Sequence, residues 1–316
     1  MSRILCAFAL LLLTPAIATA QIVVTLKNKF IEDNKLRATI EATFTVDKAH
    51  KNPNPPSKDA DLHVAGRAPE IQLPIVAELM NAKEDTVALG LIHGAETSGT
   101  PLAMTGAWRL WCEHGGTSDQ IQGQALTKFT TTNPDHCFEL HPITRVETQP
   151  TAASFHPIDA GFKTKDAFTA FTAYEAVRSE LQFNALKKTT TINTHGIGFN
   201  YVEFVIELNE NPALTTSDGG LMVMAAVQDL DGVLLVRNRR MVFAPDTAPL
   251  TAVMGKTKCD RMHVLGIPRI NLSLVSWRTR NRTARPEVMR WNLPYEMIIA
   301  AVYADNLDAS EDCVVK

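Results

Sequence analysis

Alternating hydrophobic and polar positions predict that most of the first 150 residues form β-strands. The clearest alternation is in DHCFELHPITRV, and it predicts a strand over residues 137–146. A polar turn around Glu32–Asn34 separates the first two strands. Apolar and β-branched runs predict the others at 22–29, 36–46, Leu62–Gly66, Thr86–His93 and Thr105–Glu113.

One stretch of this half has helical spacing instead. Leu73, Val76, Ala77 and Met80 follow one another at i, i+3, i+4 and i+7, and Pro74 suits the first turn of a helix. Strands, one helix and further strands, without a βαβ alternation, predict an OB-like β-barrel capped by that helix. The predicted strand Thr86–His93 is one more than such a barrel needs.

The second half follows a loop over residues 147–160. Asp166 can cap a helix that carries Phe168, Phe171 and Tyr174. The chain is then rich in strands, and Asp231-Gly232 between two apolar runs indicates a hairpin. We therefore predict a mainly β protein, with an OB-like β-barrel domain at 21–150 and a β-sandwich-like domain at 151–316.

The first twenty residues have the composition of a signal peptide. Arg3 precedes the apolar run Ile4–Leu13, and Ala18-Thr19-Ala20 forms an A-x-A cleavage signal, which predicts cleavage after Ala20. No later stretch reaches the roughly eighteen apolar residues of a membrane span. The mature protein is therefore expected to be secreted or periplasmic. The net charge of the full chain, −3, favours no particular partner.

Four cysteines remain after the predicted cleavage: Cys112, Cys137, Cys259 and Cys313. An even number in an oxidising compartment favours disulfides, and four cysteines allow three pairings. We expect Cys112–Cys137 and Cys259–Cys313, one bridge in each half. A cysteine metal site is disfavoured because no C-x-x-C spacing occurs.

Acidic residues and histidines share strand faces in two places. Alternation puts Cys137, Glu139, His141 and Ile143 on one face of their strand, and Asp61 and His63 have the same spacing. Glu78, on the predicted helix, can join them. Such a cluster can bind zinc or perform acid–base hydrolysis. The alternative is that these groups only tie strand ends together by hydrogen bonds, because no diagnostic metal or nucleophile motif is present.

A basic segment stands out in the second half. Residues 237–290 contain twelve Lys or Arg against three acids. Trp277 is followed by Arg278, Arg280 and Arg282, and arginine interleaved with tryptophan suits an anionic polymer, either nucleic acid or acidic glycan. The alternative is a solvated, positively charged sheet face.

The runs TGAWRLWCEHGG and CFELHPITRV together form a longer pattern. It resembles a group of uncharacterised bacterial exported proteins whose OB-like domain has a TG-x-aromatic…HG strand and a W-E-I-H-P-V-T strand. Phe138 replaces the tryptophan of that pattern. The resemblance covers about residues 20–150, implies an OB-like barrel with a polar cluster, and brings no known activity. The matching residues are Thr105, Gly106, His114, Gly115, Glu139, His141, Pro142 and Thr144.

These observations favour an exported, non-enzymatic binding or scaffolding protein. Two alternatives stay open: a metal-assisted hydrolase that uses the His/Asp/Glu cluster, and a binder of anionic polymer through residues 277–291. The sequence predicts no cofactor, although zinc fits the cluster.

Overall fold

The computed structural model describes residues 21–158, 161–280, 287–305, 307 and 313–314. The predicted signal peptide and Arg282 lie outside these residues. Within them, no helix is both long and apolar enough to span a membrane.

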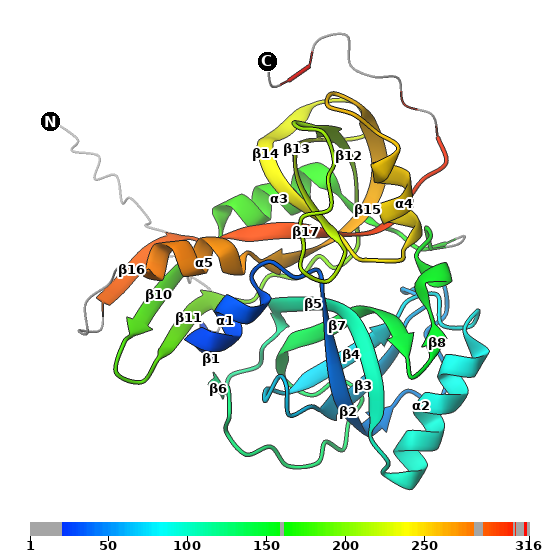
Figure 1. The fold of residues 1–316 in the computed structure, drawn as a ribbon, viewed down its shortest axis with the longest axis vertical. Helices are drawn as coiled ribbons and strands as arrows, with labels where there is room; N and C mark the ends of the chain where they lie inside the picture. The colour runs from blue at the N-terminus through cyan, green and yellow to red at the C-terminus, as the bar shows by residue number, and fades with distance from the viewer. Residues whose placement is uncertain (1–20, 159–160, 281–286, 306, 308–312, 315–316) are drawn as a thin grey trace, which may run out of the picture.

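Five strands of the first half close into a barrel, which is the lower one in Figure 1. Their order is β4-β3-β2-β5-β7, and a parallel pairing of β4 with β7 completes the circle. Helix α2 (Thr86–Ser98) connects β4 to β5. The predicted OB-like barrel is therefore confirmed. The strands are β2 (Thr39–Ala49), β3 (Leu62–Arg67), β4 (Ile75–Leu79), β5 (Leu102–His114) and β7 (His136–Val146).

The helix predicted from Leu73 is wrong, because this stretch forms strand β4. All five residues of β4 are buried, since the barrel core lies on one side and other parts of the protein cover the other. A strand buried on both faces has no polar alternation, so its apolar positions also fit a helical period.

The strand predicted at Thr86–His93 is also wrong, because these residues begin helix α2. The helix buries Ala88, Ile92 and Ala95 on one face and ends at Gly99, which has a left-handed φ of 72°. The turn predicted around Glu32–Asn34 is likewise part of a short helix, α1 (Asn28–Asn34). The predicted helix is thus a strand, and the predicted strand that follows it is a helix. With these two corrections the barrel has five strands and no surplus one.

The larger sheet of the second half also closes on itself. Its order is β13-β14-β17-β15-β12, with β12 paired back to β13 and the short strand β9 (Lys165–Asp166) at the edge of β12. Helix α4 (Ala248–Met254) connects β14 to β15, and β14 runs parallel to β17. Strand order, helix position and the parallel pair all match the first barrel. The strands are β12 (Val202–Leu208), β13 (Leu221–Gln228), β14 (Leu234–Phe243), β15 (Arg261–Ile270) and β17 (Tyr295–Val302).

The strand registers give a residue-by-residue correspondence between the barrels. Arg109 on β5 pairs with Glu139 on β7, and Arg269 on β15 pairs with Glu296 on β17. GAWRL on β5 and GIPRI on β15 share a glycine three residues before the arginine. The chain therefore contains two copies of one topology.

The two barrels contact each other reciprocally. Arg109 Nε donates to the carbonyl of Pro268 at 3.0 Å, and Arg269 Nη1 donates to the carbonyl of Trp108 at 3.1 Å. Pro268 and Trp108 occupy equivalent positions, one residue before each arginine. Contacts that exchange in this way are the signature of a two-fold interface, here formed inside one chain.

A third sheet lies beside the barrels, on the left in Figure 1. Its order is β16-β10-β11-β1-β6, and the pairing of β1 with β11 joins residues from both sides of the expected boundary at 150. The second half thus contributes strands to two sheets, its own closed sheet and this third one. This is consistent with the sandwich-like domain predicted for residues 151–316. The strands are β1 (Gln21–Lys27), β6 (Gln120–Ile121), β10 (Arg178–Asn184), β11 (Thr189–His195) and β16 (Glu287–Asn292).

The remaining elements are short. Asp166 caps α3 (Ala167–Ala176) by accepting from the backbone N–H of Thr169, as predicted. Helix α5 (Leu272–Thr279) packs on α1. The strand β8 (Gln149–Pro150) and the 3₁₀ turn η1 (Ala152–Ser154) lead into the second half.

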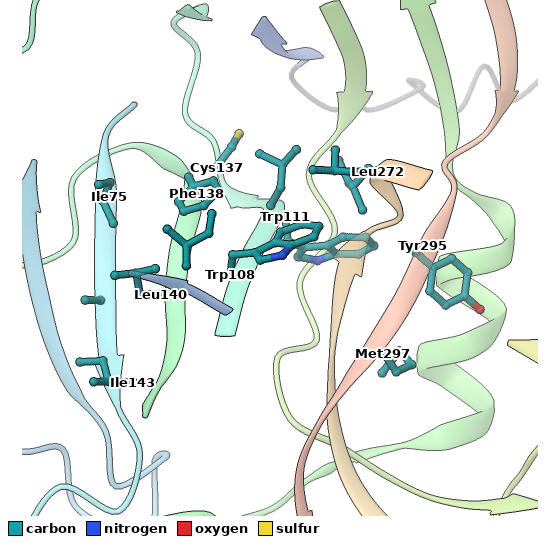
Figure 2. Close-up of a cluster of buried hydrophobic side chains, with 14 of the residues drawn as sticks. Ile75, Trp108, Trp111, Cys137, Phe138, Leu140, Ile143, Leu272, Tyr295 and Met297 are labelled. Atoms are coloured by element: carbon teal, nitrogen blue, oxygen red, sulfur yellow. The ribbon is translucent and has the colours of Figure 1, made fainter. Parts of the chain in front are cut away.

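The hydrophobic core is continuous through the molecule (Figure 2). Phe138 and Leu140 belong to the first barrel, and their counterparts Tyr295 and Met297 lie on the other side of the picture. Trp108 and Trp111 lie between them, and both are almost completely buried. These two indoles join the cores, and burying a large aromatic side chain contributes roughly 1.5–3 kcal/mol.

One of the two predicted disulfides is confirmed. Cys259 and Cys313 are bonded, with their Cα atoms 5.3 Å apart. The Cys112–Cys137 prediction is wrong, because both residues are buried as free thiols. The register shifts where they face each other, so that three residues of β5 stand opposite one of β7. Disulfide geometry is narrow, and this irregular stretch is not in regular cross-strand register.

Candidate metal centre

The predicted acidic and histidine residues do come together. They lie on the outer face of the first barrel, where the second barrel covers them. Asp61, Glu139 and His141 have no exposed surface and Glu78 is 3% exposed, while the side chain of His63 is 13% exposed. Glu78 arrives from strand β4 rather than from a helix. Alternation explains this face, because the neighbours Ala77 and Leu79 point into the barrel core.

His141 is at the centre of the cluster. Its Nδ1 lies 3.2 Å from Glu78 Oε2 and 3.3 Å from Glu139 Oε2. Its Nε2 lies 2.8 Å from the hydroxyl of Tyr201 and 3.4 Å from Asp61 Oδ2. The Tyr201 hydroxyl also donates to Asp61 Oδ2 at 2.8 Å. One imidazole therefore has three carboxylates and a phenol around it.

Ile143 does not share this face, contrary to the simple alternation of the strand. The register of β7 against β5 shifts here, so that His141 and Pro142 of β7 both stand opposite Ala107 of β5. Ile143 consequently lies in the hydrophobic core, on the other side of the strand from His141.

Arg109 is the site residue that the sequence analysis missed. Its guanidinium is fully buried and contacts Glu139 Oε2 at 2.5 Å and Glu113 Oε2 at 2.9 Å. His136 Nε2 contacts the other oxygen of Glu139 at 3.2 Å. An arginine between two tryptophans in an apolar strand was the signal available in the sequence, because an unpaired buried charge is costly. Tyr201 had no comparable signal.

Burial and neighbouring charges act in opposite directions on these groups. Burial raises the pKa of Asp61, and the result is about 7. Burial would also raise the pKa of Glu139, but Arg109 and the two histidines hold it well below its usual value. Burial alone would lower the pKa of His141, yet Glu78, Asp61 and Glu139 raise it to about 10. The carboxylates therefore favour a positive charge at the position of His141.

Three polar atoms of the cluster have no hydrogen-bond partner. They are Asp61 Oδ1, His63 Nε2 and Glu78 Oε2, and each is buried. Glu78 Oε2 nevertheless forms ion pairs with His141 Nδ1 at 3.2 Å and with His63 Nε2 at 3.7 Å, so only Asp61 Oδ1 lacks both kinds of contact in this cluster. A buried polar atom without a partner costs about 1–3 kcal/mol. One ligand atom from each of Asp61, Glu78 and His141 lies within 4.8 Å of the other two. Carboxylate oxygen and imidazole nitrogen are both zinc ligands, so the donor set fits a divalent ion.

The second barrel keeps the buried arginine–glutamate pair, as Arg269–Glu296, but has no polar residues at the positions of His63, Glu78 and His141. The registers align His63 with Met222, Glu78 with Val242 and His141 with Ile298. All three counterparts are apolar and at most 9% exposed. Since this topology accepts apolar side chains there, the polar set of the first barrel is not a requirement of the fold.

The predicted basic residues lie elsewhere, on and after helix α5. Trp277 is 58% exposed, and the guanidinium of Arg280 lies 5.7 Å from the centre of its ring. Arg278 lies 4.5 Å from the ring centre of Trp291 on β16. The described members of the predicted Arg/Trp group are therefore close together, and far in sequence from the His/Asp/Glu cluster.

Comparison with known protein families finds no family model that matches this chain, and a search of curated proteins finds no match. The resemblance to exported OB-like proteins therefore stays a prediction.

Proposed function

We propose that this chain is an exported metal-binding protein, whose ion helps to hold the two barrels together. One divalent transition-metal ion would be bound by Asp61, Glu78 and His141. The observation that carries the proposal is the set of three buried ligand atoms within 4.8 Å of one another. Asp61 Oδ1 accepts no hydrogen bond, and Glu78 Oε2 is held by ion pairs with His141 and His63 rather than by a hydrogen bond. Tyr201, from the second barrel, would orient Asp61 as an outer-shell hydrogen-bond donor.

The burial of the cluster favours a structural ion over a hydrolytic one. A catalytic zinc site keeps a coordination position open to water and substrate, whereas a structural site is closed by protein ligands. Asp61 and His141 have no exposed surface through which a substrate could reach an ion. The proposal therefore develops the binding or scaffolding hypothesis and sets aside the metal-assisted hydrolase.

Export is the second part of the proposal. The Cys259–Cys313 disulfide supports an oxidising compartment. The signal-peptide composition of residues 1–20 points the same way.

Thermal unfolding of chelator-treated mature protein, with and without Zn²⁺ or Mn²⁺, tests the proposal. A ligand at a hundredfold excess over its Kd stabilises the folded state by about 2.7 kcal/mol. We expect such a stabilisation in the wild type and none in Glu78→Val/His141→Ile.

The matched control is His263→Ile. His263 also lies between two carboxylates, Glu203 at 2.9 Å and Asp305 at 2.8 Å. It belongs to no group of three ligand atoms found among the described residues. It should keep the full metal response. A wild type that does not respond to either ion, or a response that survives in the double variant, would refute the metal site.

A further inference from the structure

A pocket of about 360 Å³ lies at one end of the third sheet. Its walls come from strands β1, β10, β11 and β16, which are distant in sequence and adjacent in the sheet. The pocket is separate from the buried cluster and rests on different residues. It is lined by Gln21, Arg178, Ser179, Glu180, Asn193, Thr194, His195, Arg290 and Trp291.

Two arginines give this pocket a positive character. Arg178 is exposed, and Arg290 is 79% exposed while it contacts Glu180 at 2.6 Å. Their surroundings add to it, because the guanidinium of Arg278 lies 4.5 Å from the ring centre of Trp291, another wall of the pocket. A local excess of positive charge attracts anions over distances of about 10 Å at ordinary salt.

The pocket also has an aromatic wall. Trp291 lines it, and Arg278 stacks over the ring of Trp291 from helix α5. Trp277 on the same helix exposes more than half of its surface, which is unusual for tryptophan. Aromatic rings beside arginines are a common way to bind polymers that carry both flat or apolar faces and negative charge.

The uncharged lining narrows the kind of polymer. Gln21 offers an exposed amide, Asn193 has a side-chain oxygen without a hydrogen-bond partner, and Glu180 offers a carboxylate acceptor. The hydroxyls of Ser179 and Thr194 are buried and donate to backbone carbonyls of the sheet. Such acceptors match a ligand with many hydroxyl donors, and the arginines match its acid groups. DNA has few hydroxyl donors, so it would leave these acceptors unmatched.

We propose that this pocket binds an acidic polysaccharide, through its carboxylate or sulfate groups at Arg178 and Arg290 and through a sugar face on Trp291. The proposal keeps the Arg/Trp hypothesis of the sequence but moves its centre from residues 277–282 to the sheet pocket.

Fluorescence anisotropy with a labelled heparin octasaccharide, and with oligogalacturonate as a carboxylate probe, tests this proposal on the mature protein. The variant is Arg178→Ala/Arg290→Ala, and Arg145→Ala/Arg237→Ala is a control of equal charge on other exposed surface. We expect the pocket variant to bind roughly tenfold more weakly at low salt. Its slope of log affinity against log salt should fall by about two, because two ionic contacts are lost.

Arg178→Lys/Arg290→Lys serves as a second variant that keeps the charge but not the planar fork, and intermediate binding is expected. Wild-type protein that binds neither acidic glycan at low salt would overturn the proposal. Equal loss in the pocket variant and the control would overturn it too, because attraction would then be non-specific. A thymidine oligonucleotide of the same charge is the third probe. If it binds more tightly than heparin, the glycan proposal is wrong and the pocket binds nucleic acid instead.

Discussion

At the scale of single residues, His141 and its carboxylates decide what the first barrel can do. A buried imidazole with three acids around it can hold a proton or can exchange that proton for a metal ion. The metal-free protein keeps the positive charge on His141, whose pKa is raised to about 10. Either state depends on Glu78, whose Oε2 lies 3.2 Å from His141 Nδ1.

The free energy of unfolding of the metal-free protein tests whether Glu78 stabilises the fold through its ion pairs with His63 and His141. Glu78→Val should destabilise it by about 3 kcal/mol, because His63 and His141 each lose a buried partner. His63→Met/Glu78→Val/His141→Ile installs the residues of the second barrel and should recover at least half of that loss. Urea unfolding of both variants checks this. A triple variant less stable than the single one would contradict it.

At the scale of elements, strand β4 and helix α2 are neighbours in sequence but have different secondary structure. The helix has polar exposed positions and a glycine end, whereas the strand is buried throughout. Two glycines of the helix region provide a matched test. A Cβ on either Gly90 or Gly99 would meet no neighbour within 4 Å, so only backbone conformation differs between them.

We predict opposite signs for the two alanine substitutions. Gly90→Ala, inside the helix, should stabilise the protein by up to about 1 kcal/mol. Gly99→Ala, at a φ of 72°, should destabilise it by about 1 kcal/mol. Thermal unfolding of the two variants is the measurement. Equal effects would mean that the helix does not end at Gly99.

These two elements also show how far the sequence alone could predict the fold. The strands β2 and β7 were predictable because polar and apolar side chains alternate along their sequences, although β7 is buried on both faces. The strand β4 was not, because its sequence IVAEL has no polar alternation and its apolar residues also fit a helical period. Alternation along β7 also predicted that Glu139 and His141 share a face. Arg109 and Tyr201 were not predicted, because they reach the site through tertiary packing.

At the scale of the whole molecule, the two barrels are joined by reciprocal contacts around buried charges. Thr39, one residue before Ile40 on β2, bonds Asp218 near the start of β13. Tyr201, one residue before Val202 on β12, bonds Asp61 near the start of β3. The repeat was hidden in the sequence, because the two copies share a glycine, an arginine and a glutamate and little else.

The Asp218 contact gives a pH dependence with a defined sign. Burial raises the pKa of Asp218, but hydrogen bonds from Thr216 and Thr39 outweigh it and lower the pKa below 3.8. A lowered carboxylate pKa gives stability that is present at neutral pH and is lost as the pH falls through the folded-state value. Asp218→Asn should therefore cost about 1–2 kcal/mol at neutral pH.

The difference between Asp218→Asn and the wild type should narrow as the pH falls below about 4, where the carboxylate becomes protonated. Urea unfolding between neutral and acidic pH measures it. Asp33→Asn is the control, because Asp33 is half exposed and pairs with Lys29 on the surface. A difference that stays constant with pH would show that the charge of Asp218 does not contribute.

The metal content of the mature protein tests the central claim most directly. The protein should be purified without a histidine tag or chelator and measured by elemental analysis, beside His63→Met/Glu78→Val/His141→Ile and His263→Ile. We predict one transition-metal ion per chain in the wild type and in His263→Ile, and none in the triple variant. A folded wild type without metal, or equal metal in all three proteins, would show that the cluster at His141 is a proton-linked charge network and not a metal site.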